Sequence, residues 1–167
     1  VAIGALYSTC PQTGKTHDPS SIRGIVPTSD ARDQFGRPLK DLRISVTDRC
    51  NFRCRYCMPR ERFSENHTFL PKRAFLSFEE IEKVVRSCMS LGLEKVRITG
   101  GEPLLRKDLP RLIEMLSGLG IEIALTTNAS LLKKEAKALH SAGLTRVTVS
   151  LDALDPELHR TMSDSNI

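Results

Sequence analysis

The sequence lacks an apolar run of about 18 residues, and it therefore predicts no transmembrane helix. Its start, VAIGALYSTCPQTG, lacks a basic leader followed by a long apolar core, so it does not predict a signal peptide. A disulfide framework is not indicated, because the five cysteines are an odd number and three of them lie within residues 50–57. These absences favour a reducing compartment with a metal or redox site, and we expect the cytoplasm, or an organellar matrix in a eukaryote.

The excess of positive charge is confined to one part of the chain. Residues 35–63 carry eight basic and three acidic side chains, whereas residues 1–34 carry three of each and residues 64–167 carry fourteen of each. The net charge of +5 therefore surrounds the clustered cysteines. An anionic cofactor or substrate would explain this distribution. A solvated basic face or a nucleic-acid patch is the alternative.

Residues 1–34 are rich in Ser, Thr, Pro and Gly and are expected to form an irregular or disordered arm. From Leu42 onward, strand and helix patterns alternate, with a capping-box pattern at Ser77 and Glu80 and a candidate N-cap at Asp108. Strands are expected at 42–47, 95–99, 121–127 and 146–152, and helices at 77–92, 108–120, 131–143 and 155–162. This alternation predicts an α/β fold with a parallel sheet, either open and doubly wound or part of a barrel.

In either architecture, the carboxyl ends of the strands lie along one edge of the sheet. The cysteine segment follows the first predicted strand, and the motifs TGGEP, TTN and SLD follow the next three. We therefore expect all four polar segments to meet at this edge and to form the functional site.

Cys50, Cys54 and Cys57 offer three thiolates, whereas structural zinc usually has four protein ligands. His67, Cys88 or Cys10 could complete a zinc site, and iron–sulfur clusters are also held by cysteine thiolates. The number of thiolates alone leaves both interpretations open.

The C-x3-C-x2-C spacing, with aromatic Tyr56 before the last cysteine, resembles the signature of the radical S-adenosylmethionine (SAM) superfamily, and GGEP at residues 100–103 resembles its second motif. The resemblance implies a [4Fe–4S] cluster on Cys50, Cys54 and Cys57, with SAM bound to the iron that has no protein ligand. It also implies the N-terminal portion of a partial (β/α)6 TIM-like barrel, with a radical SAM core at 35–167 that is truncated at its C-terminus.

From about Phe35 onward, the strings LRISVTDRCNFRCRYCMPRE and KVRITGGEPLLRKDL are more specific and resemble the GTP 3′,8-cyclases of molybdenum cofactor biosynthesis, the protein A family. Glu102 is expected to accept a hydrogen bond from the SAM ammonium group, and a larger residue at Gly101 to block SAM but spare the cluster. The resemblance implies SAM contacts at Tyr56, Gly100, Gly101, Glu102 and Ser150, and GTP contacts at Arg43, Lys95, Arg97 and Thr126.

Two features depart from that family. Ala129 stands where the family has glycine, so this residue is strained if the position requires a positive φ. The family's second, C-terminal [4Fe–4S] cluster and its terminal Gly-Gly have no counterpart in these residues. We therefore expect this span to bind the first cluster and SAM, but not to cyclise GTP by itself.

The reaction implied by the resemblance is a lyase reaction that converts GTP to (8S)-3′,8-cyclo-7,8-dihydroguanosine 5′-triphosphate through a 5′-deoxyadenosyl radical. The expected partners are GTP and an electron donor, and neither nucleic acid nor a membrane is expected. A homodimer is possible. The alternatives are another radical SAM enzyme and a zinc-stabilised basic binding module. Iron and sulfide would indicate either enzyme, whereas zinc would indicate the binding module.

Overall fold

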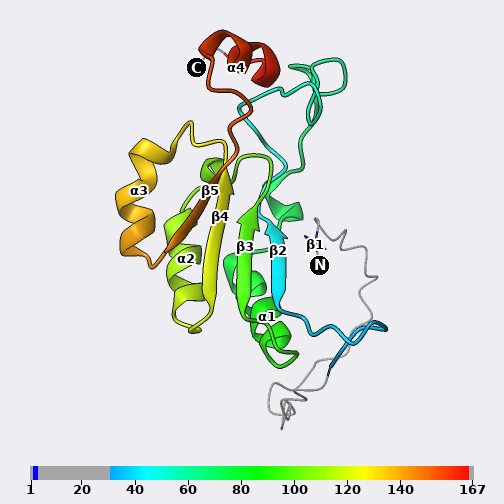
Figure 1. Ribbon diagram of the computed structural model, residues 1–167, viewed down its shortest axis with the longest axis vertical. Helices are drawn as coiled ribbons and strands as arrows, with labels where there is room; N and C mark the ends of the chain where they lie inside the picture. The colour runs from blue at the N-terminus through cyan, green and yellow to red at the C-terminus, as the bar shows by residue number, and fades with distance from the viewer. Residues whose placement is uncertain (1, 4–30, 166–167) are drawn as a thin grey trace.

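The computed structural model describes residues 2–3 and 31–165, and these residues form a single parallel sheet flanked by helices (Figure 1). The sheet has the order β1-β2-β3-β4-β5, and every neighbouring pair of strands is parallel. A doubly wound sheet reverses its strand order part-way, whereas a barrel keeps the order of the chain. The unbroken order therefore agrees with part of a barrel. The strands are β1 (Ala2–Ile3), β2 (Asp41–Ser45), β3 (Lys95–Thr99), β4 (Glu122–Thr127) and β5 (Arg146–Val149).

The helices lie close to the predicted positions. They are α1 (Phe78–Met89), α2 (Leu109–Ser117), α3 (Leu132–Ser141) and α4 (Pro156–Ser163), with short 3-10 helices η2 (Lys72–Ala74) and η3 (Pro103–Leu105). Strand β1 was not predicted, and the rest of the predicted N-terminal arm up to residue 30 lies outside the described residues. No helix among the described residues is long and apolar enough to span a bilayer.

Helices α1 and α2 cover one face of the sheet, as Figure 1 shows. On β2 and β3, the residues that point to this face are buried, for example Leu42 and Ile44 on β2 and Val96 and Ile98 on β3, and they pack with Val85 of α1 in one hydrophobic core. The alternate residues of β2 are exposed, and none of the helices among residues 31–165 covers this opposite face (Figure 1). Because side chains alternate between faces along a strand, β2 and β3 each contribute both to the core and to this open face.

Helix α1 begins as predicted. The Ser77 hydroxyl accepts from the Glu80 N–H at 3.1 Å, and the Glu80 carboxylate accepts from the Ser77 N–H at 2.7 Å. Asp108 is the N-cap residue of α2, as predicted. However, it has a left-handed backbone and its side chain makes no capping hydrogen bond. Pro110 in the first turn lacks an N–H and lowers the need for a capping acceptor.

Candidate functional site

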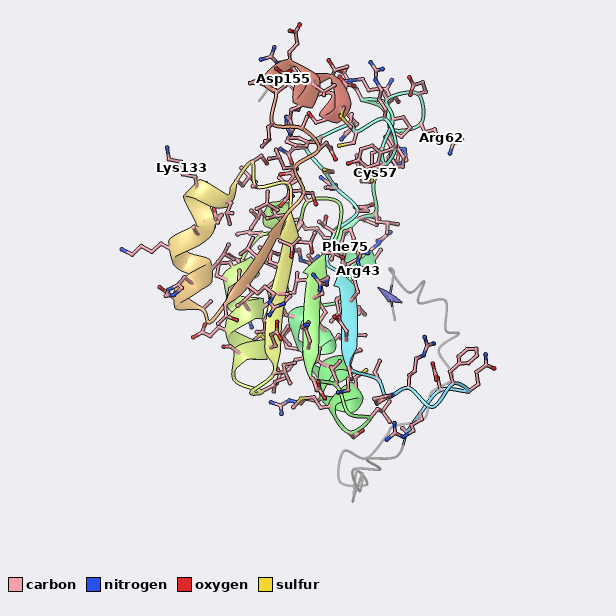
Figure 2. All side chains as sticks on the ribbon, in the orientation of Figure 1. Arg43, Cys57, Arg62, Phe75, Lys133 and Asp155 are labelled. Atoms are coloured by element: carbon pink, nitrogen blue, oxygen red, sulfur yellow. The ribbon has the colours of Figure 1, made fainter. Side chains whose placement is uncertain are left out.

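The three clustered cysteines lie at the carboxyl edge of the sheet, in the loop that follows β2. Figure 2 shows Cys57 above the strand ends, with Arg43 lower on β2. All three thiols are free; Cys50 and Cys54 are half-buried and Cys57 is exposed. Burial raises the pKa of both the Cys50 and the Cys54 thiol, and the charges of the neighbouring cysteines raise them further. Binding to a cation would favour the thiolate form of these cysteines.

This set of donors fits an iron–sulfur cluster better than a single zinc ion. Among residues 31–165, no three His, Cys, Asp or Glu side chains converge as ligands of one ion. A [4Fe–4S] cluster does not need such convergence, because each cysteine binds a different iron. Two proposed fourth zinc ligands are also engaged elsewhere: the His67 ring packs between Phe63 and Phe69, and Cys88 of α1 packs against the core. The third, Cys10, lies outside the described residues.

The two glycines of TGGEP pack directly against the backbone of the cysteine loop. The Gly101 N–H donates to the Thr47 carbonyl at 2.8 Å, and the Glu102 N–H donates to the Arg49 carbonyl at 2.7 Å. A Cβ added at Gly101 would lie 2.3 Å from the Arg49 oxygen and 3.0 Å from the Cys50 nitrogen. The absence of a side chain at Gly101 therefore permits this loop to sit where it does. A larger residue at Gly101 would therefore meet the backbone of Arg49 and Cys50, and the expectation that it blocks SAM while sparing the cluster stays a prediction.

Glu102 is fully buried, and protein groups occupy both oxygens of its carboxylate. One oxygen accepts from the Thr127 hydroxyl at 2.6 Å and the Leu104 N–H at 3.0 Å, and the other accepts from the Asn128 N–H at 2.8 Å. These hydrogen bonds join the carboxyl ends of β3 and β4. The carboxylate is thus held by protein groups at both oxygens, and the expected hydrogen bond from the SAM ammonium group to Glu102 stays a prediction.

Asn128 extends this connection to the first cysteine. Its side-chain amide nitrogen donates to the side-chain oxygen Oδ1 of Asn51 at 3.0 Å and lies 3.9 Å from the Cys50 sulfur. The next residue, Ala129, has φ = 63°, so the alanine does occupy the left-handed region as anticipated. Its N–H donates to the Thr127 hydroxyl at 3.0 Å, which fixes the turn in that conformation.

The segment after β5 holds the other end of the cysteine loop. The Tyr56 hydroxyl lies 3.0 Å from both carboxylate oxygens of Asp152, and burial together with this hydrogen bond raises the pKa of Tyr56. The Arg53 N–H donates to the Ser163 carbonyl at 3.0 Å. In addition, the Arg60 side chain pairs with Asp164. Figure 1 shows α4 beside this loop, away from the helices that cover the sheet. The predicted SLD segment thus meets the cysteine loop at the same edge.

The open face of the sheet carries three arginines in one register row. Arg43 pairs in register with Arg97, Arg97 with Ala124, and Ala124 with Arg146. The sequence analysis did not predict Arg146 as a site residue. The alternation of Arg146 and Thr148 with Val147 and Val149 could have placed it on the polar face of this strand. Ala124, between Arg97 and Arg146 in this row, is fully buried. Ser45, Thr99, Thr126 and Thr148 lie one row nearer the cysteine edge, on the same face.

Acidic residues balance only part of the positive charge on this face. Arg97 lies 3.8 Å from Asp41, Lys95 lies 3.8 Å from one oxygen of Glu122, and Arg146 lies 2.8 Å from the other. Arg43 has no ion-pair partner among residues 31–165, and its Nε lies 3.4 Å from the Thr99 hydroxyl. Four cations therefore face two carboxylates, which leaves a surplus suited to an anionic ligand.

Comparison with known protein families indicates which cofactors this site binds. The model of the radical SAM superfamily matches residues 44–166, which include the cysteine loop and all three following strand ends. The chain belongs to the radical SAM superfamily. Membership implies a [4Fe–4S] cluster and SAM as cofactors, in agreement with the three thiols at the sheet edge. Which residues contact SAM remains a prediction, and of those expected, Tyr56, Gly101 and Ser150 are exposed at this edge.

Relatives of this radical SAM chain include two proteins named GTP 3′,8-cyclase. The protein from Acidothermus cellulolyticus is 57% identical over 142 residues, which cover 84% of this chain and 39% of the relative. The protein from Staphylococcus carnosus is 56% identical over 137 residues, which cover 81% of this chain and 40% of the relative. The chain thus spans about two fifths of the length of these relatives.

Solved structures of Streptococcus suis SuiB have a similar fold. The structure of SuiB bound to S-adenosylmethionine has a TM-score of 0.58 and 26% sequence identity, and covers 74% of this chain and 28% of SuiB. The complex of SuiB with its precursor peptide SuiA has the same TM-score and identity and covers 74% of this chain and 27% of SuiB. This similarity confirms the predicted partial-barrel fold.

Proposed function

We propose that this chain is the cluster- and SAM-binding portion of a GTP 3′,8-cyclase, a lyase that catalyses the first step of molybdenum cofactor biosynthesis. The observation that carries the proposal is the 56–57% identity to two proteins of that name over most of the chain. The surplus of positive charge on the open face supports the choice of a nucleoside triphosphate as the substrate.

In this proposal, Cys50, Cys54 and Cys57 hold the cluster, and the surrounding edge, with Tyr56, Gly100, Gly101 and Ser150, receives SAM. When bound, these two cofactors supply the radical chemistry. Asn128 and the Gly101 backbone fix the position of Cys50 through the contacts described above. The protein's contribution at this edge is therefore to orient the cofactors.

Arg43, Lys95 and Arg97 are proposed to bind the triphosphate, because guanidinium groups form paired, charge-assisted hydrogen bonds with phosphate oxygens. Thr126 lies in the hydroxyl row between these cations and the cysteine edge. A triphosphate on the cations would thus direct the ribose toward the cofactors. The proposal further includes an external electron donor and a cytoplasmic location. It includes no nucleic-acid or membrane partner, and it does not specify whether the protein is a homodimer.

A chimaera tests the activity. Residues 35–165 would replace the matching segment of the Staphylococcus carnosus protein, and the purified chimaera would be assayed anaerobically with reductant, SAM and GTP. Cyclised nucleotide is expected. A folded chimaera that binds about eight irons, four for each of the two clusters, but forms no cyclised nucleotide would contradict the proposal and favour another radical SAM reaction.

Binding of GTP tests the proposed substrate site on this chain. Arg43→Gln is expected to weaken GTP binding about tenfold or more, because it removes a charge-assisted contact. Lys40→Gln is the matched control, since Lys40 is exposed and pairs with Glu94 below the open face. Equal loss in both variants would mean that net charge, rather than this site, attracts GTP.

A further inference from the structure

A hollow on the helix side of the sheet has four cations in its lining. It is a cavity of about 430 Å³, and its lining includes Arg49, Lys72, Arg106 and Lys107 but no Asp or Glu. Phe75 and Phe78 form part of its apolar wall. Drug-sized ligands occupy cavities of roughly 300–1,000 Å³ that are mostly apolar with a few placed polar groups. The hollow therefore has the size and composition of a ligand site.

This hollow is distinct from the open face that carries Arg43 and Arg97. Phe78 is the first residue of α1 and belongs to the core between the helices and the sheet. Arg43 alternates along β2 with the buried Leu42 and Ile44, so its side chain lies on the opposite face. An anion bound in the hollow would thus be separated by the sheet from an anion bound at Arg43.

The four cations of the hollow have no carboxylate partner among residues 31–165, and they share one cavity. Among residues 31–165, nine other basic side chains pair with carboxylates, whereas none of these four does. The nearby Asp48 directs one oxygen to the Leu70 N–H at 2.7 Å and does not line the hollow. Four unpaired cations around one cavity repel each other, and a bound polyanion would remove this repulsion.

One of these cations is already held in place. The Arg106 guanidinium donates to the Leu76 carbonyl at 3.0 Å and lies over the rings of Phe75 and Phe78, at 5.4 and 5.3 Å from their centroids. Burial lowers the pKa of Arg106. A cation that is partly desolvated and fixed before binding loses little entropy when an anion arrives, and it interacts more strongly than one in open solvent.

We propose that this hollow is a second anion-binding site, which takes a phosphate chain of two or more phosphates. Phosphate matches the cations because arginine binds it through paired hydrogen bonds and lysine as a point charge. Two or more linked phosphates carry enough negative charge to pair with several of the four cations, and a cavity of about 430 Å³ is large enough to hold them. Free pyrophosphate and the diphosphate of a nucleotide share this chemistry.

Calorimetric titration of the chain with pyrophosphate tests the proposal, at about 150 mM salt to screen non-specific attraction. The test variant is Lys72→Gln with Lys107→Gln, since both side chains are exposed and their loss leaves the packed Arg106 intact. The control is Lys133→Gln with Lys134→Gln on α3, which removes the same charge far from Phe75, as Figure 2 shows. Pyrophosphate binding is expected to weaken about tenfold or more in the first variant and to remain unchanged in the second.

Amide chemical shifts locate the bound pyrophosphate and separate the hollow from the proposed GTP site. Shifts are expected at Thr47, Leu70 and Phe75, and an unaltered circular dichroism spectrum checks that the test variant folds. No binding, equal loss in both double variants, or shifts confined to the open face around Arg97 would overturn the proposal. A parallel titration with ADP identifies the source: equal affinity indicates a site for free phosphate chains, and tighter ADP binding indicates a nucleotide site.

Discussion

Replacement of Gly101 by alanine should displace the loop that carries Cys50. The new Cβ would lie 2.3 Å from the Arg49 carbonyl oxygen and 2.5 Å from its carbon. Non-bonded carbon atoms pack at about 3.5–4.0 Å, so the two backbone segments must separate by roughly 1 Å. Such a movement would weaken the hydrogen bonds from the Gly101 and Glu102 N–H groups, now 2.8 and 2.7 Å long.

The cost of Gly101→Ala follows from these two hydrogen bonds. Each contributes about 1 kcal/mol, and a buried group left unpaired costs about 1–3 kcal/mol, so we expect a loss of about 2–4 kcal/mol. This is a large part of the roughly 5–15 kcal/mol that stabilises a typical domain. Because Cys50 moves with Arg49, iron bound after anaerobic reconstitution should also decrease, whereas a purely SAM-blocking effect would leave iron unchanged.

Gly118→Ala provides the matched control for this measurement. Gly118 ends α2 with a helical φ of −61°, and its added Cβ would lie 3.5 Å from the Met115 carbonyl oxygen, which is an ordinary contact. Urea unfolding and iron analysis should leave this control within about 1 kcal/mol of the parent. If Gly101→Ala unfolds at the same urea concentration as the parent and binds about four irons, the proposed packing role of Gly101 is refuted.

Three further substitutions test the contacts at the sheet edge. Glu102→Gln should destabilise the chain by about 1–3 kcal/mol in urea unfolding, because an amide cannot accept at both ends from Thr127 and Asn128; an unchanged midpoint would contradict the described hydrogen bonds. Ala129→Gly should relieve strain and lie within about 1 kcal/mol of the parent, whereas Ala129→Val should be clearly less stable; equal stability of both would mean that the turn relaxes. Asp152→Asn should increase amide hydrogen exchange in residues 53–57 with little change in global stability, and unchanged exchange there would show that Tyr56 does not anchor the loop.

The sequence predicted the strands and helices well because each follows a strong local pattern. The capping box at Ser77 and Glu80 and the alternation along 42–47 act through neighbouring residues, and both appear as predicted. Strand β1 was missed because two residues are too short for a periodic pattern to develop. Asp108 is at the predicted N-cap position, but the sequence did not indicate its left-handed backbone or the lack of a capping hydrogen bond from its side chain.

The contacts at the functional edge depend on residues that are distant in the sequence, and this limits what a motif can predict. GGEP was recognised as a cofactor motif, yet the partners of its glycines are Thr47 and Arg49, more than fifty positions earlier. Likewise, Tyr56 meets Asp152 only because successive parallel strands bring their carboxyl ends to one edge. A residue in such a motif can therefore be required for two reasons, cofactor contact and loop packing. Iron retention and SAM binding, measured separately on one variant, distinguish these reasons at Gly101, because only the packing role predicts that iron is lost.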